Sequence, residues 1–115
     1  MDPIIEQAEK LGKAIAESPA AVKLRAARKD VNGNAELSQL LRDYQTQSEK
    51  LARLEQDNKP VEVDDKHKLK ELEEQLLSSE QFKKLTAAQV DYVDLMRKVN
   101  SALRQQLNEV EGEED

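Results

Sequence analysis

The chain has 115 residues, a length that suits about one domain with a thin hydrophobic core of its own. Hydrophobic residues make up 37% of the sequence and charged residues another 37%, with one Phe and no Trp, so there are few bulky aromatics to fill strands or ligand pockets. The absence of cysteine excludes disulfides, thiolate metal sites, cysteine-ligated iron–sulfur clusters and thiol nucleophiles among these residues. The common residues Leu, Ala, Lys, Glu, Gln and Arg favour helices, which predicts an all-α fold.

The formal net charge of −6 is concentrated at the carboxyl end, where five negative charges come from Glu109, Glu111, Glu113, Glu114 and Asp115. The remainder is nearly neutral and has no broad positive field that would hold nucleic acid. We therefore expect a single helical domain over residues 1–110 and a disordered acidic tail over 111–115. No basic segment followed by an apolar stretch opens the sequence, and no run approaches the ~18 apolar residues of a membrane span. This pattern predicts a cytoplasmic protein that does not bind membranes.

Two helices are predicted in the first third of the chain. An N-cap followed by proline, Asp2-Pro3, begins an amphipathic pattern over about 3–17. The same signal at Ser18-Pro19 begins a second, shorter helix, which Asn32-Gly33-Asn34 ends.

Two further helices are predicted in the middle of the chain. A leucine stripe starts after Asn34, which is a suitable N-cap, and runs to Asp57, with a polar gap at Gln47-Ser48. The segment 59–63 contains a proline and is typical of a linker. Asp64-Asp65 is then expected to cap a fourth helix.

The last helix is the longest, because from Ser79 to Gly112 the apolar residues repeat almost every seven positions without an interrupting Gly or Pro. At 1.5 Å per residue it would be roughly 45–50 Å long, whereas a small domain is only about 30 Å across. Its stripe therefore needs a partner, either the third helix packed antiparallel or a second subunit. We expect the third and last helices to form the long pair, the first two to pack at one end, and Tyr44, Phe82 and Tyr92 to be the largest anchors.

One internal similarity is visible at a constant offset. Ser18-Pro19 with Lys23-Leu24-Arg25-Ala26-Ala27 matches Ser79-Glu80 with Lys84-Leu85-Thr86-Ala87-Ala88. Two explanations stay open: either two helix starts use the same common residues independently, or a helical hairpin has been duplicated.

The order of elements resembles a known family. A short first helix is followed by a second helix, which begins at Ser18 and contains Leu24 and Ala27, and then by a break at 32–35. The third helix contains the stretch Leu-Leu-Arg-Asp-Tyr-Gln at 40–45. A proline-containing linker and a long last helix come later in the chain. Over about residues 3–110 this order is similar to the YlbF/YmcA family of bacterial helical proteins. The resemblance implies an all-α fold, homo-oligomers or hetero-complexes, and a regulatory role. Two members are linked to competence, sporulation, biofilm formation and an RNA-processing endonuclease through a complex that can carry iron–sulfur clusters. Because this sequence has no cysteine, cluster binding by that route does not carry over.

No catalytic, metal-binding or cofactor-binding residue is predicted. His67 is the single histidine, and neither a zinc site nor a hydrolytic triad can be assembled from one imidazole without further ligands or a serine elbow. Carboxylate pairs such as Glu73-Glu74 are typical of solvated helix faces rather than of a desolvated cleft. The three glycines are isolated and form no phosphate-binding loop. We therefore do not expect an enzyme.

Two basic patches are open to interpretation. Their members are Lys23, Arg25, Arg28 and Lys29 in the second helix, and Lys66, Lys68 and Lys70 in the fourth. Each patch suits a solvated or internally paired face, an acidic protein partner, or RNA. No aromatic residue is interleaved to stack bases, which places RNA last.

The sequence thus predicts an elongated antiparallel helical hairpin or bundle of about five helices with a coiled-coil-like C-terminal helix. Its expected function is that of a non-catalytic, YlbF-like adaptor or regulator that forms homo-oligomers, a dimer or higher, and binds other proteins. The alternative is a structural coiled coil or a prefoldin-like holdase chaperone. The residues expected to carry oligomerisation and protein binding are apolar and lie on the two long helices: Leu37, Leu41, Tyr44, Leu51, Leu85, Tyr92, Met96, Val99, Leu103 and Leu107.

Overall fold

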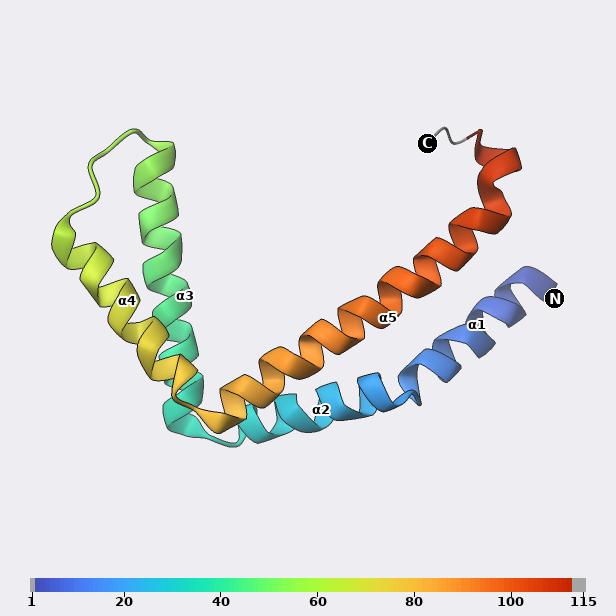
Figure 1. Cartoon of the computed structure of the whole chain (residues 1–115), viewed down its shortest axis with the longest axis horizontal. Helices are drawn as coiled ribbons and strands as arrows, with labels where there is room; N and C mark the ends of the chain where they lie inside the picture. The colour runs from blue at the N-terminus through green and yellow to red at the C-terminus, as the bar shows by residue number, and fades with distance from the viewer. Residues whose placement is uncertain (1, 113–115) are drawn as a thin grey trace. The chain divides into compact units, whose positions relative to one another are not determined.

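The structure is a computed structural model that describes residues 2–112. Over that range it contains five α-helices and no strand, as Figure 1 shows: α1 (Pro3–Ala16), α2 (Pro19–Asn32), α3 (Ala35–Gln56), α4 (Val63–Leu77) and α5 (Glu80–Glu111). The predicted all-α class is confirmed, and each observed boundary lies within a few residues of the expected one.

Helix capping explains most of these boundaries. The Asp2 carboxylate accepts a hydrogen bond from a backbone amide in the first turn of α1 at 2.9 Å. Ser18 and Asn34 cap α2 and α3 in the same way at 3.2 and 3.1 Å. The predicted cap of α4 is wrong, because Glu62 occupies the N-cap position and makes no side-chain cap bond. Asp64 and Asp65 lie inside the first turn, where negative charge is favoured by the helix dipole.

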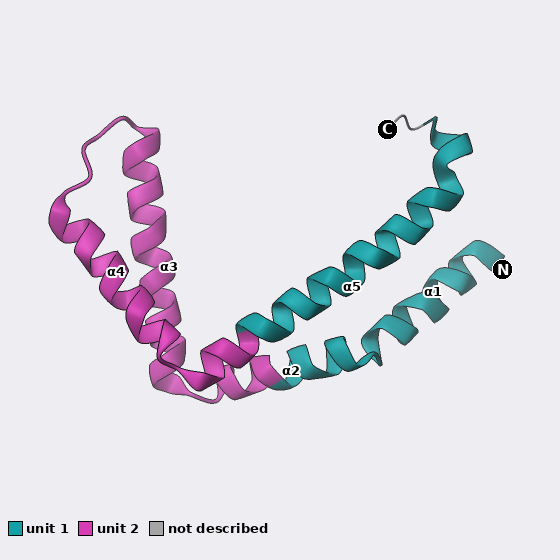
Figure 2. Cartoon of the chain, viewed as in Figure 1, with its two compact units in different colours: residues 1–26, 86–115 teal, residues 27–85 magenta. Residues whose placement is uncertain are grey.

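The chain divides into two compact units, coloured separately in Figure 2. Unit 1 comprises residues 1–26 and 86–115, and unit 2 comprises residues 27–85. The expectation of one domain over 1–110 stays a prediction. Of the expected acidic tail, Glu111 belongs to α5, while residues 113–115 lie outside the described part of the chain.

Unit 2 has a hydrophobic core, where α3 packs against α4 (Figure 1). Val31, Leu37 and Leu76 are its buried centre. Five partly buried side chains pack around them: Leu40, Leu41, Tyr44, Phe82 and Leu85. The expected long pair between the third and last helices is therefore wrong. The short connection over 57–62 turns the chain back on itself, so that the leucine stripe of α4 covers the face of α3 that we had assigned to α5.

A polar contact fixes the alignment of α3 on α4. Gln47 is only 5% exposed, and its amide nitrogen donates a hydrogen bond to the backbone oxygen of Asp65 at 2.9 Å. One turn further along α3, Lys50 forms a salt bridge with the Asp65 carboxylate at 3.0 Å. The polar gap in the α3 stripe is thus a contact with the beginning of α4, and its buried amide is satisfied.

Unit 1 buries fewer apolar side chains than unit 2 in the described part of the chain. Its buried apolar residues in the described part of the chain are Ala21, Leu24 and Ala88. The internal similarity has a structural counterpart, since Ser79 caps α5 with the same 3.2 Å contact that Ser18 makes in α2. Whether a duplication produced it stays a prediction.

Candidate protein-binding surfaces of unit 1

The first candidate surface is the α1 apolar stripe, which comprises Ile4, Ile5, Leu11 and Ile15. Proline at the first helical position and the Asp2 cap favour a helix here, and apolar residues at helical spacing make it strongly amphipathic. No residue of α1 is buried, and Ile4 is 75% exposed. A helix of this length is marginal in water unless its apolar face is covered.

The second surface is the α5 apolar stripe, formed by Val99, Leu103, Leu107 and Val110. These residues are spaced by three or four positions and therefore lie on one face of the helix. Val99 is half-buried, whereas Leu103, Leu107 and Val110 are 47%, 41% and 83% exposed. The stripe is thus partly covered at Leu103 and Leu107 and largely uncovered at Val110.

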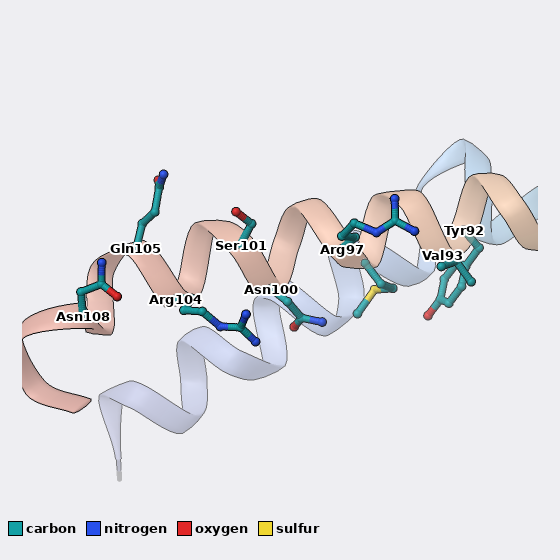
Figure 3. A pocket seen from close by; sticks show the side chains of 9 residues that line it. Tyr92, Val93, Arg97, Asn100, Ser101, Arg104, Gln105 and Asn108 are labelled. Carbon is teal, nitrogen blue, oxygen red and sulfur yellow. The ribbon is translucent and has the colours of Figure 1, made fainter. Parts of the chain in front are cut away.

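The third surface is an open hollow of about 900 Å³ along one side of α5, which we term the α5 groove. Figure 3 shows its side chains projecting from successive turns of the helix. Its apolar end is formed by Tyr92, Val93 and Met96. The rest is cationic or uncharged and polar: Arg97, Asn100, Ser101, Arg104, Gln105 and Asn108. None of the four α5 stripe residues lines it, but Tyr92 and Met96 at its apolar end precede Val99 at the same helical spacing, so the groove begins where the stripe does.

The electrostatics of the groove differ from those of the whole chain, whose net charge is negative. Among the nine described residues that line the groove there are two arginines and no carboxylate. Arg97 shares a carboxylate with a second cation, because Asp94 forms salt bridges with Arg97 at 3.6 Å and with Lys98 at 3.2 Å. One carboxylate between two cations leaves an excess of positive charge at this end of the groove.

The residues that we predicted for protein binding are divided between the two units. In unit 2, Leu37 and Leu51 are buried, and three others pack against the core: Leu41, Tyr44 and Leu85. In unit 1, the half-buried Tyr92 and Met96 line the groove, and the remaining three belong to the α5 apolar stripe: Val99, Leu103 and Leu107. The unit 2 residues stabilise the protein's own fold, whereas those of unit 1 are half-buried or exposed. Their role in binding stays a prediction.

Sequence reasoning missed the polar half of the groove, because Arg97, Asn100 and Arg104 are indistinguishable from an ordinary solvated face. The signal that could have found them is their spacing of three and four residues beside Tyr92 and Met96.

The two basic patches noted in the sequence are exposed on α2 and α4. Among the salt bridges of the described residues, none involves either patch. His67 is also exposed. Within residues 2–112, no three side chains of metal-ligating type are grouped so as to hold an ion, and no helix has the length and apolarity to cross a membrane.

Comparison with known proteins shows a family and a fold to which the chain is similar. The sequence profile of the family described as control of competence regulator ComK, YlbF/YmcA, matches residues 4–108. Among solved structures, a protein of unknown function (DUF964) from Bacillus stearothermophilus is similar, with a TM-score of 0.71 and 16% sequence identity over 96% of both chains. At that identity the likeness shows the fold alone. Comparison with curated proteins yields no significant relative.

Proposed function

This chain belongs to the YlbF/YmcA family, and from that premise we propose that it is a non-catalytic regulator that self-associates and binds other proteins through helical surfaces. The family description concerns control of the competence regulator ComK, which supports a regulatory role. Self-association and partner binding are the physical means by which we expect the protein to perform that role.

The observation that carries the proposal is the exposure of two apolar helix faces in unit 1. Ile4 in α1 and Leu103 in α5 belong to apolar stripes that the described chain leaves partly uncovered. Burial of such side chains contributes about 25 cal/mol per Å² of apolar surface, so covering both stripes with protein stabilises the assembly and orders α1. A second copy offers the same two stripes, which makes a symmetric interface possible.

The apolar exposure also suits the alternative, a structural coiled coil or prefoldin-like holdase, because a chaperone of that kind holds unfolded chains on exposed apolar residues. The two functions differ in selectivity. A regulator retains one or two partners in fixed stoichiometry, whereas a holdase retains many unfolded chains.

A pull-down with the tagged wild-type protein from cells of the source organism tests the proposal. We expect one or two stoichiometric partners, lost in Leu103→Asp and kept in Ala87→Asp, which places the same charge at another exposed position of α5. Both variants must first show wild-type helix content by circular dichroism. Recovery of many proteins in variable amounts, together with suppression of aggregation of a denatured test protein, would favour the holdase instead.

A further inference from the structure

We propose that two copies of this chain pair through the carboxyl-terminal half of α5, with the two helices antiparallel and a two-fold axis at Leu103. The inference rests on the proposed function, because it assigns the partner and the geometry of the α5 apolar stripe. It names a second copy as the occupant of this face and specifies which residues meet.

The apolar residues in this part of α5 are arranged symmetrically about Leu103. Starting at Met96, successive members are three, four, four and three positions apart: Met96, Val99, Leu103, Leu107 and Val110. When a second α5 runs antiparallel about an axis at Leu103, Met96 lies opposite Val110 of the second copy. Val99 then lies opposite Leu107, and Leu103 opposite its own counterpart. Every layer of the contact is therefore apolar, as a symmetric interface requires.

Exposure favours this position of the axis over one nearer the amino end of α5. The stripe is half-buried at Val99 and 83% exposed at Val110. Earlier apolar positions of α5 are occupied within the chain, since Ala88 is buried and Leu85 packs against the unit 2 core. An axis nearer the amino end would oppose exposed residues to these occupied ones. An axis at Leu103 lets the exposed end of each copy cover the half-buried part of the other.

Charge favours the antiparallel direction. Lys98 and Glu109 are eleven residues apart, which is about three turns, so both flank the stripe on the same side. In an antiparallel pair equivalent flanks face each other, so Lys98 of each copy lies beside Glu109 of the other. A parallel pair would instead bring the two acidic carboxyl ends together, where Glu109 and Glu111 repel their counterparts. The excess positive charge beside Asp94 thus faces the acidic end of a second copy.

The contact is short and leaves one nearby cation outside it. From Met96 to Val110 the paired segment is about 21 Å long at 1.5 Å per residue, which is small for a specific interface, so we expect a reversible dimer. Arg104 is the charge nearest the two-fold axis. It lies about a quarter turn from Leu103 and already interacts within the described chain, so it stays outside the apolar layers.

Disulfide crosslinking of the full-length protein tests this geometry, because the sequence contains no cysteine. Leu103→Cys should form a linked dimer with oxidised glutathione, since the axis brings the two thiols within bonding distance. Val99→Cys and Leu107→Cys should each crosslink poorly alone, because equivalent residues are about 12 Å apart along the helix axes. An equal mixture of these two variants should crosslink at least about fivefold more than either variant alone.

Charge reversal tests the same arrangement without cysteine. Lys98→Glu and Glu109→Lys should each raise the dimer dissociation constant about tenfold in sedimentation, because two attractive pairs become repulsive. An equal mixture of the two variants should recover the wild-type affinity, because the heterodimer again opposes unlike charges. Lys84→Glu makes the same charge change at an exposed position of α5 before the paired segment and should stay within about twofold of the wild type. All variants must show wild-type helix content by circular dichroism.

Four results would overturn the arrangement. They are the absence of a disulfide in Leu103→Cys, self-crosslinking of Val99→Cys as strong as in the mixture, no recovery when the charge variants are mixed, and an equal loss in Lys84→Glu. The second would indicate a parallel pair, and the last would place the axis nearer the amino end of α5.

The same experiments separate this inference from the proposed function. If the wild type self-associates and Leu103→Asp makes it monomeric, the proposed function stands even where one of those four results rejects the antiparallel pairing. A wild type that is monomeric at every concentration would contradict both. A monomeric wild type that loses a bound partner protein on Leu103→Asp would assign the stripe to that partner instead of a second copy.

Discussion

Two neighbouring leucines of α4 provide a direct test of the unit 2 core. Leu76 is 3% exposed and belongs to the buried centre with Val31 and Leu37, whereas Leu77 is 52% exposed. Leu76→Ala truncates a buried side chain and leaves a cavity, so the free energy of unfolding should fall by about 3 kcal/mol, within the 2–5 kcal/mol typical of such changes. Leu77→Ala loses only part of its transfer free energy and creates no cavity, so its cost should be about 1 kcal/mol or less.

Urea unfolding followed by circular dichroism measures this difference. With a denaturant slope of about 1.5 kcal/mol per M, the Leu76→Ala midpoint should fall by roughly 2 M and the Leu77→Ala midpoint by well under 1 M. Both variants and the wild type must be compared at one protein concentration, because self-association adds to apparent stability. Equal midpoints for the two variants, or a larger loss at Leu77, would refute the packing of α3 on α4 described above.

Three further outcomes are expected. Far-UV circular dichroism should show a helix content far above the roughly one-third of average globular proteins. The helix content should not change when chelator or zinc is added. A metal-dependent shift of several degrees in melting temperature would contradict the expectation that the fold needs no metal. Gln47→Ala should lower the free energy of unfolding, measured in urea, by about 1–2 kcal/mol, because the hydrogen bond to Asp65 is lost inside the α3–α4 contact. Gln45→Ala, at an exposed position, should lower it by less than about 0.5 kcal/mol. Deletion of residues 111–115 should leave the oligomeric state and partner binding intact, with at most a salt-dependent change in association rate. If this deletion alone abolishes partner binding, the binding surface is not helical.

Local structure was predictable from the sequence because it depends on nearby residues. Asp2, Ser18 and Asn34 each combine a capping side chain with a following helical pattern, and each caps the helix that was expected. The start of α4 was misplaced because Asp64-Asp65 suits both an N-cap and a first turn, and composition does not separate the two.

The pairing of helices was not predictable in the same way. A leucine stripe shows which face of α3 is buried but not what covers it, and both α4 and α5 carry stripes of suitable length. The Gln47 side chain and the Asp65 backbone oxygen, which align α3 on α4, belong to residues that read as ordinary polar positions in the sequence, and only the structure shows their contact. The α5 groove was not predicted for a similar reason. In the sequence its arginines and amides look like ordinary surface residues, and only the structure shows that they line one hollow with Tyr92.

Sedimentation velocity of the wild type and Leu103→Asp over a range of protein concentrations tests the central claim most directly. If the exposed apolar stripes of unit 1 mediate self-association, the wild type should sediment as a dimer or larger species and gain thermal stability with concentration. Leu103→Asp should shift the population to monomer, because it places a charge in the middle of the α5 apolar stripe, while Ala87→Asp should behave as the wild type. A wild-type protein that sediments as a monomer at every concentration, with a melting temperature independent of concentration, would contradict the account.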